Sequence, residues 1–194
     1  MGGIYTLGRQ SGTVISENCV HDVRCLEYGA WGIYLDEGSS NITVENNVVW
    51  GTGKESIHIH WGTDNTVRNN VFLGENSSVA TVSVKEWHHP SVFERNIMVS
   101  DGQTVLRGKP RDCTYHANVM YDRSGRDTVI FSDEEENSYT LDSWEKAYPH
   151  NCGNSVADPG ISSVEEKDLT LLESSPAMEL GFENILERAV REKK

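Results

Sequence analysis

The sequence is poor in basic residues and lean in apolar ones. It has 17 lysines and arginines against 30 aspartates and glutamates, so its formal net charge is −13 at pH 7. This charge disfavours nucleic acids and anionic membranes as partners, and acidic polysaccharides unless the charges are segregated, whereas neutral glycans meet no such objection. Hydrophobic residues make up 37 % of 194 residues. That is enough for one folded domain with a modest core.

Long apolar runs and paired cysteine motifs are also missing. No stretch approaches the roughly 18 apolar residues that a membrane span needs, and the first residues read as a strand rather than a signal peptide. We therefore expect no membrane partner. The four cysteines, Cys19, Cys25, Cys113 and Cys152, lack C-x-x-C spacing. This argues against a zinc site and leaves a disulfide unassigned, so we expect unpaired, partly buried thiols.

Two short patterns recur along the first two thirds of the chain. One contains an asparagine, and its copies lie at 13–20, 42–49, 65–72, 91–98 and 113–120. The other alternates apolar and polar residues and lies at 3–7, 32–36, 56–60 and 81–85. Alternation predicts half-buried strands, so each unit of 22 to 29 residues should hold two short strands. No long helical period separates them, which excludes a βαβ architecture.

A unit this small can bury its apolar face only against its neighbours. Stacked units would form parallel sheets about 4.8 Å apart, with the recurring asparagine at a tight bend. There its amide can bond the asparagines of adjacent coils, and asparagine tolerates left-handed backbone angles. A propeller blade would need about 40–50 residues and four strands. The sequence therefore predicts an all-β, single-stranded parallel β-helix.

The repeat becomes irregular after residue 122. We expect coils over residues 1–132 and a C-terminal capping segment over 133–194, packed on the coils as part of one domain. Residues 127–132 should supply one more strand, and 141–148 and 182–194 should form helices. The acidic loop 133–137 is predicted to be a solvated turn rather than a calcium site, because its carboxylates lack the spacing of a calcium loop.

The asparagine register aligns side chains into columns along the stack. Inward positions hold Ile4, Ile33, Ile57 and Val82, then Thr6, Leu35, Ile59 and Val84. The outward columns read Tyr5, Tyr34, His58, Ser83; then Leu7, Asp36, His60, Lys85, Arg107; then Gly8, Glu37, Trp61, Glu86, Gly108, with Trp87, His88 and His89 beside them. The position of His60 assumes a one-residue deletion in the turn that follows it.

Ionisable and aromatic groups thus converge on one face. Indole rings can stack on sugars, and carboxylates and imidazoles can transfer protons. The catalytic candidates are Asp36, Glu37, His60, Lys85 and Glu86. The substrate-binding candidates are Tyr34, His58, Trp61, Trp87, His88 and Arg107. An ordinary polar face with charge ladders is the alternative.

Glycoside hydrolysis needs two carboxyl groups, about 5–5.5 Å apart for retention and about 6.5–9.5 Å for inversion. Asp36 or Glu37 would lie two coils from Glu86, about 9.6 Å, near the inverting limit. Elimination, with Lys85 or Arg107 as base, ranks lower because nearby carboxylates oppose a lowered lysine pKa.

His58 and His60 point the same way on one strand, with Asp36 one coil away, so the three could bind a metal ion. Hydrogen bonding to substrate hydroxyls or proton transfer is the preferred interpretation, and we expect no metal.

The repeat, read with 32–40 (GIYLDEGSS) and the tail segments 157–161, 168–171 and 174–182, resembles the right-handed β-helix proteins of the pectate-lyase-like superfamily, most closely their bacterial glycoside-hydrolase branch. The resemblance implies a right-handed coil and a glycoside hydrolase acting on a plant or microbial polysaccharide, outside the cell or in the periplasm. It also leaves open a lyase, with calcium, or a non-catalytic carbohydrate-binding or structural fragment. Asp36 is the one site residue that the resemblance itself carries over.

Relatives of this kind usually have more coils and an N-terminal cap, whereas this chain starts inside the repeat. Uncapped strand edges are templates for pairing. We therefore expect self-association through the first coil, or a chain cut from a longer one.

Overall fold

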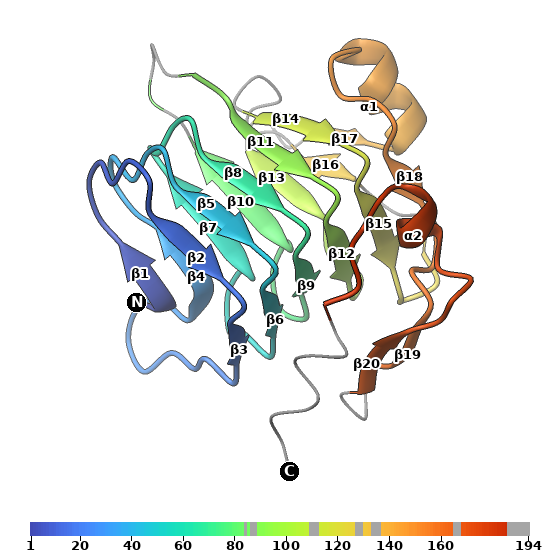
Figure 1. The fold of residues 1–194 in the computed structure, drawn as a ribbon, viewed down its shortest axis with the longest axis horizontal. Coiled ribbons are helices and arrows are strands. Elements are labelled where there is room, and N and C mark those ends of the chain that lie inside the picture. Colours follow the sequence, from blue (N-terminus) through green and yellow to red (C-terminus); the bar gives the residue numbers. More distant parts are fainter. Residues whose placement is uncertain are drawn as a thin grey trace.

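The computed structural model describes residues 1–83, 85, 89–108, 113–126, 130–132, 137–164 and 168–185. Three sheets of parallel strands run along the molecule and enclose its core (Figure 1). Each coil contributes three strands rather than two, because the asparagine pattern bends in its middle and feeds two different sheets. The chain is a parallel β-helix, as predicted, with only two short helices in the described part.

The strands of each sheet follow one another along the stack. The first sheet contains β1 (Gly2–Thr6), β4 (Trp31–Leu35), β7 (Ile57–His60), β10 (Ala80–Ser83), β13 (Leu106–Gly108), β16 (Phe131–Ser132) and β17 (Ser138–Tyr139). The second contains β2 (Val14–Ser16), β5 (Thr43–Glu45), β8 (Thr66–Arg68), β11 (Ser91–Glu94) and β14 (Cys113–His116). The third contains β3 (Cys19–His21), β6 (Val48–Trp50), β9 (Val71–Leu73), β12 (Ile97–Ser100), β15 (Val119–Asp122) and β18 (Ser155–Val156).

A ladder of asparagine amides runs along the corner between the second and third sheets. The Nδ2 of Asn47 donates to Oδ1 of Asn70 (3.0 Å), and Asn70 donates in turn to Asn96 (2.9 Å). Each Oδ1 also accepts from the backbone N–H of the preceding asparagine, as Asn70 does from Asn47 (2.9 Å). The ladder begins at Asn18 and continues through Asn118 to Asn154. The predicted ladder is confirmed, with Asn154 as a member that the sequence analysis missed.

The left-handed backbone angle at this corner falls one residue earlier than predicted. The residues with positive φ are those just before the ladder asparagines: Glu17, Asn46, Asn69, Arg95 and Ala117, at 51° to 58°. None of the ladder asparagines has a positive φ. The bend therefore comes from the preceding residue, and the asparagine amide closes it by bonding across coils.

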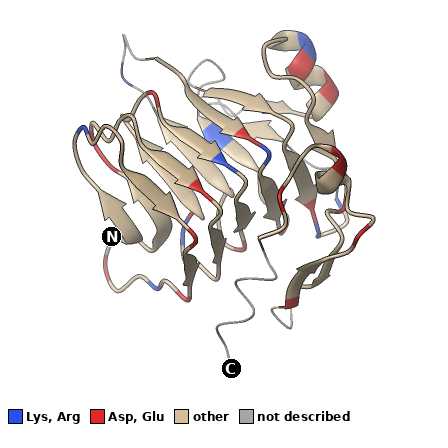
Figure 2. Cartoon of the chain, viewed as in Figure 1, with Lys and Arg blue, Asp and Glu red and all other residues tan. Residues whose placement is uncertain are grey.

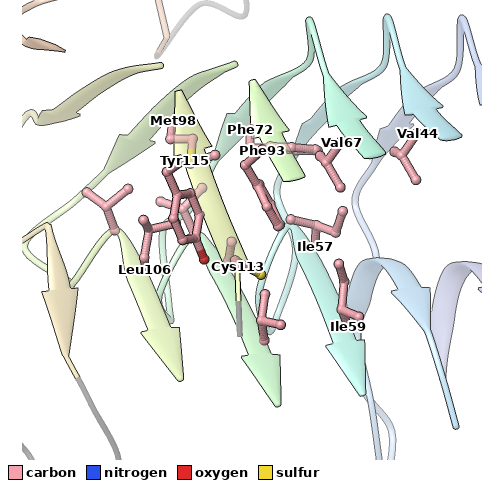
Figure 3. Packing of buried hydrophobic residues seen from close by; sticks show 14 of the residues in the cluster. Val44, Ile57, Ile59, Val67, Phe72, Phe93, Met98, Leu106, Cys113 and Tyr115 are labelled. Carbon is pink, nitrogen blue, oxygen red and sulfur yellow. The ribbon is translucent and has the colours of Figure 1, made fainter. Parts of the chain in front are cut away.

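The interior is a continuous apolar column. Ile33, Leu35, Ile57 and Ile59 are fully buried, and Figure 3 shows such side chains from all three sheets meeting inside the coils. The cluster extends to Tyr115, Phe131 and Trp144 near the far end. The predicted inward positions of the second and third coils are confirmed, whereas Val84 lies outside the described residues.

The third sheet is buried on both faces over its middle strands, β6, β9 and β12. Outside it pack the antiparallel pair β19 (Ile161–Ser163) and β20 (Asp168–Leu171), and α2 (Pro176–Glu179), which the sequence analysis did not predict. A second apolar cluster forms there, including Val48, Val71 and Ile97 from the sheet and Phe182 from the tail. Burial on both faces explains why these strands read as unbroken apolar runs. The outer face of the first sheet bears no such layer in the described chain.

The C-terminal end of the stack is closed. Helix α1 (Leu141–Ala147) starts at Thr140, whose hydroxyl accepts from the Ser143 backbone N–H, and it buries Trp144 against Phe131 at a ring distance of 5.5 Å. The helix predicted at 141–148 is confirmed. Residues 182–185 are not helical, and the rest of the second predicted helix lies outside the described residues, as do 127–129 and the acidic residues 133–136. The boundary at 132/133 stays a prediction.

The sequence analysis aligned the fourth coil with the third two residues out of register: Val82 lies beside Ile59 and not beside Ile57. Strand β10 pairs with β7 so that Thr81 lies beside His58 and Ser83 beside His60. On β13, Arg107 lies beside Thr81, and it therefore belongs to the His58 column rather than the His60 column. A shift of two residues keeps every side chain on its own face of the sheet, so alternation alone cannot detect it.

Two further results concern composition. Cys113 is buried, whereas Cys19, Cys25 and Cys152 are exposed. In the described part of the chain, no helix is both long and apolar enough to cross a membrane.

Replacing a ladder amide should destabilise the fold strongly. Asn70 is fully buried, and its Nδ2 donates to the Val44 and Arg68 carbonyls as well as to Asn96. Asn70→Ala removes these three hydrogen bonds and the two that its Oδ1 accepts from Asn47, so we expect a loss of about 2–4 kcal/mol in urea unfolding. Ala117→Gly is the control, because glycine suits a φ of 52°. It should be neutral or stabilising by up to about 1 kcal/mol. Equal midpoints for Asn70→Ala and the parent protein would contradict the structural role of the ladder.

Candidate functional site

The candidate site lies on the outer face of the first sheet, over strands β1, β4 and β7. Parallel pairing sets Tyr5 beside Tyr34 and Tyr34 beside His58, because these residues occupy equivalent positions in successive coils. Asp36 follows β4 directly, and His60 ends β7. The face therefore holds aromatic and ionisable side chains from three successive coils.

Asp36 is held by two tyrosine hydroxyls. Tyr5 donates to its Oδ2 at 2.7 Å and Tyr34 donates to its Oδ1 at 2.8 Å. Partial burial acts to raise the pKa of Asp36, but the two hydrogen bonds outweigh it, and the pKa is lowered. Burial and the same carboxylate raise the pKa of Tyr34, so its phenol stays protonated. Asp36 is thus a fixed, ionised carboxylate, suited to act as a base or an orienting group rather than an acid.

His60 is the side chain most able to accept a proton. Its Nδ1 lies 3.2 Å from the Tyr34 hydroxyl and 3.4 Å from Asp36 Oδ1. A proton on Nδ1 is shared with this hydroxyl and carboxylate, which leaves the Nε2 lone pair available. Burial and the charge of His58 lower the pKa of His60, although Asp36 and Glu37 oppose the shift. The imidazole is therefore neutral at pH 7, and its side chain is 31 % exposed.

Glu37, Trp61 and Lys85 form the rim of the face. Lys85 Nζ lies 3.2 Å from Glu37 Oε1 and 3.4 Å from the centroid of the Trp61 ring. Trp61 has a φ of 57°, uncommon for a bulky residue, and its backbone N–H bonds the Ser83 carbonyl at 2.6 Å. Because Lys85 is paired with a carboxylate and stacked on an indole, it is a poor candidate for a catalytic base.

A buried carboxylate, Glu55, lies next to this face and was missed from the sequence. Glu55 is 8 % exposed and accepts from Trp31 Nε1 (2.6 Å), Ser77 (3.0 Å) and Thr81 (3.2 Å). His58 Nδ1 lies 3.8 Å from its Oε2. Burial acts to raise the pKa of Glu55, but His58 and the hydrogen bonds lower it by more, so that the pKa falls to about 2. Trp31 begins β4, and Glu55 lies at the equivalent position one coil later, two residues before β7, so extending the columns by two residues would have paired them.

An aromatic cluster joins the two carboxylates. The Trp31 ring lies 4.4 Å from Tyr34 and 5.4 Å from His58, and Tyr34 lies 5.2 Å from His58. Tyr34 and Trp31 are buried, so they support the surface rather than form it. His58, His60 and Trp61 are partly exposed and are the rings that a ligand can reach.

The structure brings seven of the candidates together: Tyr34, Asp36, Glu37, His58, His60, Trp61 and Lys85. Arg107 is exposed on β13, beyond Thr81, and farther along the stack. Glu86, Trp87 and His88 lie outside the described residues, so the proposed pairing of Glu86 with Asp36 or Glu37 stays a prediction.

The metal alternative finds no support in the geometry. Over the described ranges, no three His, Cys, Asp or Glu side chains are arranged to hold a metal ion. In particular, His58 is directed at Glu55 whereas His60 is directed at Asp36, so the three proposed ligands do not share a centre.

The ionised state of Glu55 should make stability depend on pH. Its pKa falls from 4.5 in the unfolded chain to about 2 in the fold. Its stabilising contribution is therefore complete above pH 4.5 and is lost as the pH falls towards 2, by up to about 3 kcal/mol. Glu55→Gln removes this dependence while keeping an acceptor for Trp31. Urea unfolding at several pH values should show that the difference in unfolding free energy between the parent protein and Glu55→Gln shrinks as the pH falls from 4.5 towards 2. Parallel stability curves would contradict the assignment.

Comparison with known proteins agrees with the architecture. Residues 2–72 match the family described as "Right handed beta helix region". These residues span the first coils and include Asp36, Glu37, His58, His60 and Trp61. A search of curated proteins and a search of solved structures each found no match. Residues 2–72 are thus similar to the right-handed β-helix family, and the stacked parallel coils continue the same β-helix architecture through the rest of the described coils.

Proposed function

We propose that the outer face of the first sheet binds a carbohydrate and that the protein hydrolyses a glycosidic bond there. The observation that carries this proposal is the relay from His60 through the Tyr34 hydroxyl to Asp36. It combines a neutral, partly exposed imidazole with an ionised carboxylate that two tyrosines hold in place.

In this scheme His60 acts as general base. Its Nε2 accepts a proton from a water molecule as that water attacks the anomeric carbon, and the Asp36 carboxylate stabilises the imidazolium that results. Tyr5 and Tyr34 are positioning residues, because they fix Asp36 without reaching the sugar. Glu37 follows Asp36 directly and has an exposed carboxyl group, and it is our candidate for the acid that protonates the leaving oxygen. Glu86 is the other candidate.

Charge on this face favours a neutral glycan. Asp36, Glu37 and Glu55 surround the histidines, and Lys85 is already paired with Glu37. A uronate would have to displace that pairing to gain a cation. Trp61 offers an indole at the rim for contact with a sugar ring. Because a polysaccharide is too large to enter a cell intact, we place the activity outside the cytoplasm.

The test is a panel of neutral and acidic glycans with reducing ends as the readout. We expect release from a neutral glycan, and a loss of at least about 100-fold in kcat/KM for Asp36→Asn and for His60→Gln. Glu45→Gln is the matched control, because Glu45 lies on the second sheet and pairs with Arg68. Its activity should equal that of the parent protein.

The pH profile provides a second readout. Because the pKa of His60 is lowered from its ordinary 6.5, the acidic limb of the activity profile, where the imidazole becomes protonated, should lie below pH 6.5. Unsaturated products detected by ultraviolet absorbance would show elimination instead. Binding without turnover would show a carbohydrate-binding protein, and neither binding nor turnover on any glycan would reject the assignment to carbohydrates.

A further inference from the structure

One outward column of side chains on the second sheet lies apart from the candidate glycan site. Its members lie two residues before each ladder asparagine, and parallel pairing sets them beside one another in successive coils. They are Glu45, Arg68, Glu94 and His116, which end β5, β8, β11 and β14. Figure 2 shows acidic and basic positions alternating at the ends of β5, β8 and β11. The next coil adds Cys152, which lies two residues before Asn154 and forms a parallel bridge with His116.

Cys152 and His116 form a pair of nucleophile and base. The Sγ atom of Cys152 lies 3.7 Å from Nδ1 of His116, within hydrogen-bonding distance for sulfur. Cys152 is exposed, whereas His116 is half-buried. A thiol becomes an active nucleophile when an adjacent imidazole takes its proton. The thiol of Cys152 therefore has its base in place and its sulfur open to solvent.

The segment that carries the thiol is fixed to the strand that carries the imidazole. On one side of the thiol, the buried Asn151 accepts a hydrogen bond at its Oδ1 from the Tyr115 backbone N–H (2.9 Å). On the other side, Asn154 accepts from the Asn118 backbone N–H (3.1 Å) and donates to the Tyr115 carbonyl (3.0 Å). Tyr115 and Asn118 lie on either side of the histidine in sequence, so the asparagines set the distance between the sulfur and the imidazole.

Other ionisable groups near the pair have partners of their own. Glu94, one coil before His116, lies 2.9 Å from the Arg95 guanidinium, and the Arg95 backbone N–H bonds the His116 carbonyl. His150 is exposed, and its Nε2 lies 3.3 Å from the Asn151 amide. His116 is thus the titratable group in contact with the thiol, and it is the group placed to take the thiol proton.

We propose that Cys152 is a site of reversible modification by low-molecular-weight disulfides, with His116 as the general base. As the Cys152 sulfur attacks one sulfur of the reagent, His116 takes the thiol proton, and the S–S bond of the reagent breaks. The leaving thiolate then takes the proton from the imidazolium. Cys152 is oxidised to a mixed disulfide, one half of the reagent is reduced to a thiol, and a second thiol molecule reverses the exchange. Exchange at sulfur requires access and a proton acceptor but no enclosed pocket, which fits the exposure of Cys152.

Oxidised glutathione is the probe, and mass spectrometry of peptides from the 194-residue chain measures the rate of modification at each cysteine. Cys25, which is exposed as well, is the internal reference. At about pH 7 we expect Cys152 to react at least about tenfold faster than Cys25. His116→Gln should lower the Cys152 rate to that of Cys25 and leave the Cys25 rate unchanged. His150→Gln is the matched control, because it removes an exposed imidazole two residues from the thiol, and it should react like the parent protein.

The pH dependence of these rates is a second measurement, and it uses the parent protein alone. Reaction through a thiolate rises about tenfold per pH unit below the pKa of the thiol. The Cys152 rate should rise less steeply than the Cys25 rate between about pH 7 and 8, because the imidazole removes the Cys152 proton during the reaction. Equal rates at the two cysteines, equal slopes, or an unchanged Cys152 rate in a His116→Gln variant that circular dichroism shows to be folded would each overturn the proposal.

Discussion

The hydrogen bond between asparagine amides of successive coils is the interaction on which the rest of the structure depends. It fixes one corner of every coil directly above the same corner of the next, at N–O distances of 2.9 to 3.0 Å. Buried amides must be paired, and a one-residue slip would unpair several of them together. The ladder thereby holds the axial register, although the interval between successive ladder asparagines ranges from 22 to 36 residues. Loops absorb that variation on the outside.

Because the register is fixed, side chains from different coils meet at short range on the outer surface. Tyr5, Tyr34 and His60 converge on Asp36 only because their strands are stacked in this way. A carboxylate in such a partly apolar setting is costly unless hydrogen bonds stabilise its charge. At Asp36 and at Glu55, those bonds outweigh the burial and keep both groups ionised. At His60, by contrast, burial is the largest effect, and it lowers the pKa.

The three sheets are used differently, and this difference selects the site. The C-terminal segment covers the third sheet with a second apolar cluster, and α1 closes one end of the core. The second sheet exposes a face where Glu45 and Arg68 form an ordinary surface ion pair. The first sheet sets several partly exposed titratable groups, Asp36, His58 and His60, on the buried aromatic rings of Trp31 and Tyr34. The surface available for chemistry is thus defined as much by what the tail covers as by the residues that remain outside.

The sequence by itself determined the stacked coils and the face on which each side chain lies, because the asparagine repeat and the alternation of strands are local patterns with a fixed period. It also placed Asp36 and His60 in one column, once a one-residue deletion in the turn after His60 was assumed. The tertiary structure decided the pairing of Thr81 with His58, because a two-residue shift leaves alternation unchanged. It decided the position of Glu55 as well, since a carboxylate just before a strand reads as an exposed turn until Trp31 of the preceding coil is placed against it. The tertiary structure also decided how the core is capped, because Trp144 contacts Tyr115 and Phe131 of other segments, and no local pattern in the sequence records such contacts.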